Sequence, residues 1–186
     1  MSEFAALVLA GGRANRLGGV DKPALTLDGE SLVARAVKAA RAADADPIVV
    51  VGPERPGVEA VWARENPPFG GPVAALAAGL PLVLAEWALV LAADLRRPHD
   101  IVRALVDAPR AEDGAHLVDA DGHAQWLCGL YRTEALRAQV SSLEAVTGAS
   151  MRALLAPLRL AKHPISDDIV ADVDTPADAR DAGITL

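Results

Sequence analysis

The chain has 186 residues, which is enough for one domain with a substantial core, and we predict a single domain over residues 1–186. Hydrophobic residues make up 52% and aromatic residues only 3%, so small aliphatic side chains must fill that core. The formal net charge of −7 argues against a nucleic-acid or anionic membrane surface, which would need a basic patch. No apolar run approaches the roughly 18–20 residues of a membrane-spanning helix. We therefore expect neither nucleic acid nor a membrane as a partner.

The N-terminal segment and the single cysteine both bear on location. The segment "MSEFAALVLAGG" has no basic stretch ahead of its apolar run and carries Glu3, so it lacks the pattern of a secretory signal peptide. Cys128 has no second cysteine with which to form an internal disulfide. Both features predict a cytoplasmic protein.

Short apolar runs alternate along the chain with segments of helical periodicity. In chain order, the runs predict strands at residues 5–10, 47–52, 58–63 and 87–93, a pair of strands within 115–131, and a last strand at 158–163. Helices are expected over residues 31–43, 72–86 and 98–108, with short helices after residue 131. Continuously apolar strands are typical of an α/β fold, a mostly parallel sheet with helices on both faces. In such sheets, ligands bind beyond the carboxyl ends of the strands.

Local signals support these elements. Pro72 follows two glycines and stands where the first turn of a helix tolerates proline. Asp121 and Gly122 supply the turn expected between the two strands of residues 115–131. After Ser31, five apolar side chains recur at helical spacing and form one stripe: Leu32, Val33, Ala36, Val37 and Ala40.

The first predicted strand runs directly into a loop that is rich in glycine and basic residues, "AGGRANRLGGVDKP". Glycines let backbone N–H groups approach phosphate oxygens, and basic side chains supply positive charge. The loop lacks the Gly-Lys-Ser/Thr ending of a Walker loop and the Gly-x-Gly-x-x-Gly of a dinucleotide-binding fold. A solvated connection with tight turns is the alternative, but this density of charge favours a triphosphate site. The residues concerned are Gly11, Gly12, Gly18, Gly19, Arg13, Arg16 and Lys22.

The segment "LAGGRANRLGGVDKPAL" closely resembles the signature loop of the molybdenum cofactor guanylyltransferase (MobA) family. Members have Leu-Ala-Gly-Gly, three variable residues, Arg, an apolar residue, Gly-Gly and then Asp-Lys. The resemblance covers nearly the whole chain and implies a Rossmann-like nucleotidyltransferase fold. It implies that the Leu-Ala-Gly backbone holds guanine and ribose, that the next glycine and basic residue contact phosphates, and that the lysine clamps the triphosphate. In this sequence these positions are Leu9, Ala10, Gly11, Gly12, Arg13 and Lys22.

Asp94 follows the predicted strand at 87–93, at the edge where ligands bind. A carboxylate there can hold Mg²⁺ against a triphosphate, although a turn or helix-capping aspartate has the same local pattern. The resemblance implies the metal-binding role, and a catalytic set of Arg13, Lys22 and Asp94. Arg96 and Arg97 precede the next proline, which the family places two residues after the aspartate. The exit from this strand is therefore expected to differ.

The resemblance assigns two more positions to the nucleotide. Gly52 ends the second predicted strand. Asn66 stands in the loop where the family carries a nucleotide-contacting aspartate. An amide in this place can still form hydrogen bonds but supplies no charge.

Three further positions fall on the acceptor side by the same resemblance. Gln125 belongs to a segment that normally reads Gly-x-x-Gln-Pro-Leu, and Trp126 takes the place of the proline. Asp172 and Asp174 precede the Thr-Pro of the last segment, "DVDTPADA", which in the family faces the second substrate. Asp174 either binds the metal or, with Thr175, caps the last helix.

These features predict an enzyme that transfers GMP from GTP to molybdopterin with Mg²⁺ as cofactor, releasing pyrophosphate and giving molybdopterin guanine dinucleotide. The resemblance also implies transient contact with molybdoenzymes or other cofactor-biosynthesis proteins. Three alternatives stay open: a relative that uses CTP, one whose acceptor is cobinamide phosphate or a sugar phosphate, and a non-catalytic nucleotide-binding protein. A Rossmann oxidoreductase is disfavoured because the Gly-x-Gly-x-x-Gly pattern is missing.

Overall fold

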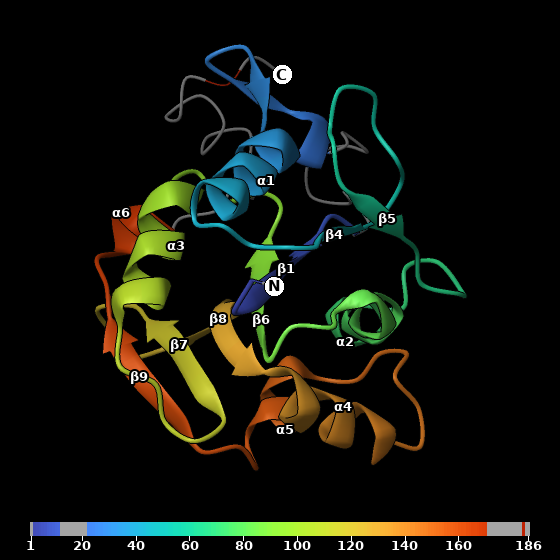
Figure 1. The fold of residues 1–186 in the computed structure, drawn as a ribbon, viewed down its shortest axis with the longest axis vertical. Coiled ribbons are helices and arrows are strands. Elements are labelled where there is room, and N and C mark those ends of the chain that lie inside the picture. The colour runs from blue at the N-terminus through green and yellow to red at the C-terminus, as the bar shows by residue number, and fades with distance from the viewer. Residues whose placement is uncertain (1, 12–21, 171–183, 185–186) are drawn as a thin grey trace.

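A computed structural model describes residues 2–11, 22–170 and 184 of the chain. At its centre lies a five-stranded sheet with the order β5-β4-β1-β6-β8 (Figure 1). These strands are β1 (Phe4–Leu9), β4 (Ile48–Val51), β5 (Val61–Ala63), β6 (Trp87–Ala92) and β8 (Ala124–Arg132). β8 is antiparallel to β6, and the other four strands are parallel to one another. The predicted α/β fold with a mostly parallel sheet is confirmed.

Two further strands lie beyond β8. They are β7 (Gly114–Val118) and β9 (Leu160–Pro164), which pair with each other in parallel, and β7 also forms a hairpin with β8. β7 runs beside β8, and a backbone hydrogen bond from Asp119 N to His123 O at 3.1 Å closes the turn between them. At the other end of the hairpin, Arg132 N donates to Asp113 O at 2.9 Å. The prediction of two strands joined by a turn in this region is confirmed.

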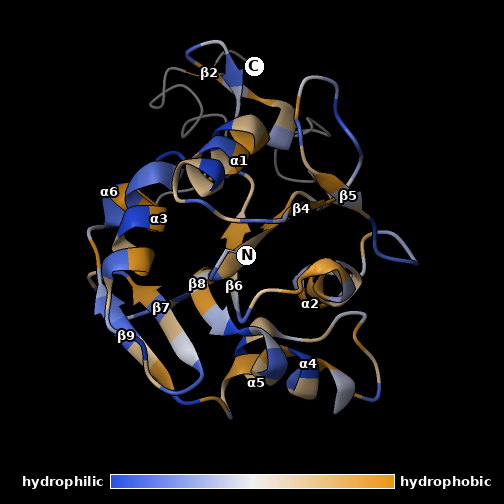
Figure 2. Ribbon diagram, in the orientation of Figure 1, coloured by the Kyte–Doolittle hydropathy of each residue, from blue (hydrophilic) through white to orange (hydrophobic). Residues whose placement is uncertain are grey.

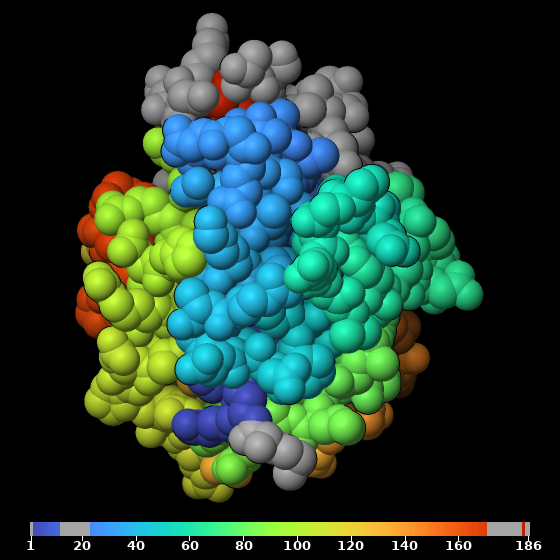
Figure 3. Space-filling view, turned by 45° about the horizontal axis from the view of Figure 1, so that its top comes forward, coloured from blue at the N-terminus to red at the C-terminus, as the bar shows by residue number. Residues whose placement is uncertain are grey.

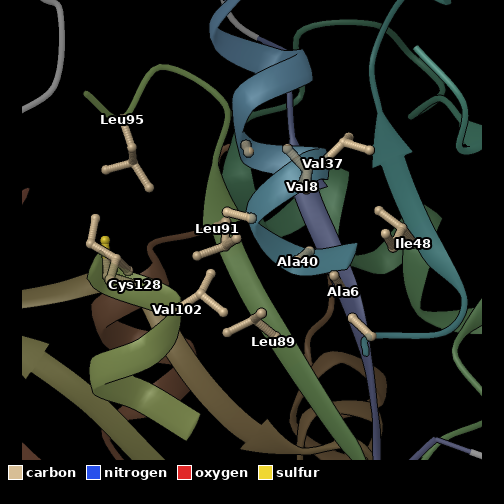
Figure 4. Close-up of a cluster of buried hydrophobic side chains, with 14 of the residues drawn as sticks. Ala6, Val8, Val37, Ala40, Ile48, Leu89, Leu91, Leu95, Val102 and Cys128 are labelled. Atoms are coloured by element: carbon tan, nitrogen blue, oxygen red, sulfur yellow. The ribbon is translucent and has the colours of Figure 1, made fainter. Parts of the chain in front are cut away.

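Helices cover both faces of the sheet, which is why every residue of β1 is buried. On one face lie α1 (Leu32–Ala42) and α3 (Pro98–Asp107), and on the other lie α2 (Pro72–Gly79), α4 (Thr133–Ser141) and α5 (Met151–Leu155). Figure 4 shows the first face, where Val8 of β1 lies near Val37 of α1 and Ala6 lies near Ala40. Leu7 and Leu9, which alternate with them along β1, belong to the cluster on the opposite face.

The distribution of polar residues on each helix reflects how much of its surface is buried. Figure 2 shows that α2 is apolar almost all round, whereas α1 and α3 carry polar residues on their outer sides. Figure 3 shows the outer surface of α1 (blue) between α3 (yellow-green) and the segment that follows β4 (teal). In the part of the chain that the structure describes, no helix is both long and apolar enough to cross a membrane.

Local signals decide where the helices begin and end. α1 begins where Ser31 Oγ accepts a backbone hydrogen bond at 3.3 Å, and the whole predicted stripe of α1 is buried. α2 begins at Pro72 as predicted, but the prediction that it continues to residue 86 is wrong, because it ends at Gly79. The next turn is the 3₁₀ helix η3 (Leu80–Leu82), since Pro81 has no N–H to continue an α-helix.

The structure also contains short elements with no counterpart among the predictions. η2 (Lys22–Ala24) follows the glycine-rich loop, β2 (Thr26–Leu27) and β3 (Glu30–Ser31) form a hairpin, and α6 (Asp167–Val170) follows β9. β5 covers only the last part of the strand predicted at residues 58–63.

Candidate functional site

The carboxyl ends of three parallel strands meet at one edge of the sheet, where backbone hydrogen bonds join them. Ala10 N, just after β1, donates to Val51 O at the end of β4 at 2.8 Å. Ala93 N, just after β6, donates to Leu9 O at 3.1 Å. The structure therefore places Leu9 and Ala10, two of the predicted nucleotide-binding positions, at the junction of the three strands, and both are buried.

Gly52 lies directly against this junction. Its N–H donates to Ala63 O of β5 at 2.9 Å, which fixes the backbone just after β4. A Cβ atom at Gly52 would lie 2.8 Å from Ala10 O and 2.9 Å from the Ala10 carbonyl carbon. Only glycine leaves room for Ala10 in its present position, so Gly52 helps to set the geometry of the predicted nucleotide edge.

We expect Gly52→Ala to lower the free energy of unfolding by about 1–3 kcal/mol, because the new methyl group must displace the Ala10 backbone. The same displacement should weaken GTP binding. Urea titration measures the first effect and calorimetric titration with GTP the second. Gly29→Ala is the control: its methyl group meets nothing within 4 Å, but its φ of 80° makes any side chain unfavourable. The control should therefore lose stability and keep GTP affinity; an equal loss of affinity in both variants would contradict the prediction.

A buried carboxylate faces the first glycine of the glycine-rich loop. Glu65, which comes shortly after β5, is only 7% exposed. Its Oε1 accepts a hydrogen bond from Phe69 N at 3.1 Å and lies 3.3 Å from where a Cβ of Gly11 would be. Its Oε2 is buried and has no hydrogen-bond partner among the residues that the structure describes. A buried carboxylate oxygen without a donor is costly, so this atom is suited to accept a hydrogen bond from a ligand.

Glu65 is a residue that the sequence analysis missed. Asn66, the position predicted there from the family resemblance, is exposed, and the side chain beside Gly11 belongs to the preceding residue. The predicted role of Asn66 stays a prediction. A signal was available, because an acidic residue in this loop matches the charge of the family's aspartate better than an amide does.

Asp94 lies two residues after β6, beside the junction, and is half-buried. Mg²⁺ in proteins is usually held by one or two carboxylates together with substrate phosphates. A half-buried carboxylate at the carboxyl edge of the sheet fits such a site. Arg97, close by, donates to Asp100 at 2.8 Å and to Asp168 at 2.5 Å, so its guanidinium links α3 to α6.

Several predicted site residues lie outside the described residues or are only partly described. Lys22 is the first residue of η2, directly after the glycine-rich loop. Gly12, Arg13, Asp172 and Asp174 lie outside the described residues. The roles assigned to these five residues stay predictions.

A cavity of about 260 Å³ lies at the end of β6. Ala92 and Leu95, which flank Asp94 in the sequence, form part of its wall. Gln125 and Trp126 line it from the start of β8, and Met151 lines it from α5. The structure thus places Gln125, the described residue predicted for the acceptor side, on a cavity that adjoins the Asp94 segment.

Two buried aromatic residues, His116 and Tyr131, contact Trp126. Its ring lies 4.6 Å from that of His116, measured between centroids, at an interplanar angle of 34°. Burial, aided by the positive charges of Lys162 and His163, lowers the pKa of His116 to about 4. The imidazole is therefore neutral near pH 7. Tyr131, a fully buried core residue, donates its hydroxyl to Trp126 O at 2.8 Å.

Similar solved structures identify the fold. An inositol-1-phosphate CTP transferase from T. maritima has a TM-score of 0.78 and 15% identity, covering 98% of this chain and 95% of that one. A molybdopterin-guanine dinucleotide biosynthesis protein A from Archaeoglobus fulgidus has a TM-score of 0.68 and 19% identity, with 96% of each chain covered. The fold is that of these nucleotidyltransferases, and Asp94 follows β6 at the carboxyl edge of its sheet.

Sequence comparisons then give the family. Residues 6–164 match the MobA-like NTP transferase domain. A protein of Synechococcus elongatus is named "Probable molybdenum cofactor guanylyltransferase". It is 32% identical in an alignment 188 positions long, which covers 94% of this chain and 95% of that protein. The chain belongs to the MobA-like NTP transferase family and is a nucleotidyltransferase.

Proposed function

We propose that this enzyme transfers GMP from GTP to the terminal phosphate of molybdopterin, giving molybdopterin guanine dinucleotide and pyrophosphate. The observation that carries the proposal is that Glu65 faces Gly11, which comes just after β1, while Asp94 follows β6, the strand beside β1 in the sheet. The relative named as a molybdenum cofactor guanylyltransferase, similar along nearly its whole length, supports this choice of substrates. Contact with other cofactor-biosynthesis proteins and a cytoplasmic location stay predictions.

The proposed reaction is an in-line displacement at the α-phosphorus of GTP. An oxygen of the acceptor phosphate forms the new bond to phosphorus, the bond to the β-phosphate oxygen breaks, and pyrophosphate leaves with that electron pair. A phosphate nucleophile is already ionised near neutral pH, so no general base is needed, and positioning and charge are the main requirements. Arg13 and Lys22 would neutralise the triphosphate. Asp94 would hold Mg²⁺, which when bound supplies positive charge at the phosphates.

Glu65 supports guanine as the base. Of the four common nucleobases, only guanine presents two adjacent donors, N1–H and the N2 amino group, on its Watson–Crick edge. A carboxylate accepts two such donors side by side, and hydrogen bonds to a charged acceptor are the stronger kind. The buried Oε2 of Glu65, which lacks a donor in the described structure, would accept one of these bonds.

We expect Glu65→Gln to raise the dissociation constant for GTP about 10- to 30-fold, because an amide replaces the charged acceptor while shape is kept. Affinity for CTP should change much less. Calorimetric titration of each nucleotide without acceptor measures both. Glu54→Gln, an exposed position in the segment after β4, should behave as the wild type. An unchanged GTP affinity, or an equal loss for all nucleotides, would show that Glu65 does not read the base.

The whole proposal is tested by pyrophosphate release with each of GTP, CTP, ATP and UTP, with and without molybdopterin and Mg²⁺. Release that requires GTP, molybdopterin and Mg²⁺ together is the expected result. Release with CTP in place of GTP would assign the chain to the cytidylyl branch and overturn the choice of base. Binding of nucleotide without turnover on molybdopterin, cobinamide phosphate or a sugar phosphate would favour the non-catalytic alternative.

A further inference from the structure

We infer that the cavity at the end of β6 binds a flat, fused heteroaromatic ring of the acceptor, and that Trp126 is the residue that selects such a ring. The inference rests on the proposed function, in which a phosphorylated acceptor reaches the nucleotide beside Asp94. It goes further because it identifies the cavity residues that determine acceptor specificity.

The size and place of the cavity suit one ring system. Its volume of about 260 Å³ lies just below the range of roughly 300–1,000 Å³ that holds whole drug-sized ligands. This volume is on the scale of one fused bicyclic ring rather than of a whole acceptor with its phosphate arm. Because Ala92 and Leu95 of the wall flank Asp94, an arm leaving the cavity on that side reaches the nucleotide edge.

Trp126 offers this ring a fixed aromatic wall. The neutral, buried ring of His116 packs against the indole, and the Tyr131 hydroxyl binds the Trp126 carbonyl oxygen, so side chain and backbone are both held. A side chain that is already immobilised loses little conformational entropy when a ligand stacks on it. Stacking of a heteroaromatic ring on an aromatic side chain contributes enough to change affinity roughly 5- to 150-fold. Met151 adds a polarisable thioether that packs well against aromatic edges.

Gln125 supplies the polar group that orients the ring. Its Nε2 donates to Asp119 Oδ2 at 3.1 Å. Asp119 Oδ1 in turn accepts from His123 N at 2.8 Å and from Asp121 N at 3.1 Å. Asp119 is partly desolvated, but these hydrogen bonds outweigh that effect and lower its pKa. An ionised Asp119 fixes the amide orientation, which leaves Oε1 of Gln125 to accept a hydrogen bond from a ring N–H.

The test is calorimetric titration of the full chain with neopterin monophosphate as a phosphorylated pterin and with ribose 5-phosphate as a ring-free comparison. We expect Trp126→Leu to weaken binding of the pterin about tenfold or more, Trp126→Phe to weaken it less than about threefold, and neither to change GTP affinity. Gln125→Met, which keeps the side-chain length but removes the amide, should also weaken pterin binding. Ribose 5-phosphate should bind all four proteins equally.

Trp62→Leu is the matched control, because Trp62 is a partly buried tryptophan in β5 at the other end of the sheet order. It should leave pterin binding unchanged. Equal pterin affinity of wild type and Trp126→Leu would overturn the inference, as would equal losses in Trp126→Leu and Trp126→Phe. Pterin binding that depends on Trp126, without pyrophosphate release in the wild type, would support the cavity assignment and refute the proposed reaction. Release with molybdopterin whose KM is unaffected by Trp126→Leu would do the reverse.

Discussion

Asp94→Asn should lower kcat for pyrophosphate release about 1,000-fold, which corresponds to about 4 kcal/mol of lost transition-state stabilisation. The amide keeps the size of the side chain but lacks the negative charge that would hold Mg²⁺ against the phosphates. The variant should also need a higher Mg²⁺ concentration for its residual activity. Steady-state assays over a range of Mg²⁺ concentrations measure both effects.

Two controls separate this loss from general damage. Asp107→Asn changes an exposed aspartate at the last residue of α3 and should leave kcat unchanged. The free energy of unfolding of Asp94→Asn should stay within about 1 kcal/mol of the wild type, as expected of a half-buried polar exchange. Full activity of Asp94→Asn, or an equal fall of kcat in Asp107→Asn, would show that Asp94 does not take part in the reaction.

Acidification from about pH 7 to about pH 4 should cost the wild type about 3 kcal/mol more unfolding free energy than it costs His116→Phe. His116 is only 1% exposed, and neither ring nitrogen has a hydrogen-bond partner in the described part of the chain. Its pKa of about 4 lies below the unfolded value near 6.5. Between these two values the unfolded state binds more protons, so this contribution is complete above the unfolded pKa. It is lost as the pH falls through the window.

Urea titrations at several pH values across this window measure the effect. Phenylalanine at position 116 keeps an aromatic ring beside Trp126 but cannot take up a proton, so the difference between the two pH profiles isolates the imidazole. His99→Gln changes an exposed histidine of α3 and should follow the wild-type profile. Parallel profiles of wild type and His116→Phe would show that burial of His116 does not oppose its protonation.

The framework of the fold could be predicted because its signals are local. Continuous apolar runs predicted β1, β4 and β6, and the stripe after Ser31 predicted the buried face of α1. Two further local signals in the sequence account for elements that differ from the predictions. Asp28 and Gly29, with φ of 55° and 80°, form the turn between β2 and β3, as an Asp-Gly pair typically does. Pro81 marks the early end of α2.

The site could be predicted only where position along a strand decides it. The rule that ligands bind at the carboxyl edge locates Leu9, Gly52 and Asp94 without knowledge of tertiary contacts. Glu65 is buried because it packs beside Gly11, far earlier in the chain. Its negative charge distinguishes it from the exposed Asn66, but the local sequence does not show that it is buried. The cavity is likewise made by residues of separate elements, which a single sequence does not bring together.

The hydrogen bond from Ala93 N to Leu9 O has a consequence for how such enzymes diversify. It joins β1, which precedes the glycine-rich segment, to β6, which leads into Asp94, through main-chain atoms, which every amino acid supplies. The side chains of Gln125 and Trp126 take no part in that link. Mutation can therefore remodel the proposed acceptor cavity while the spacing of β1 and β6 is conserved, so the proposed chemical step can be inherited unchanged as new acceptors are recruited.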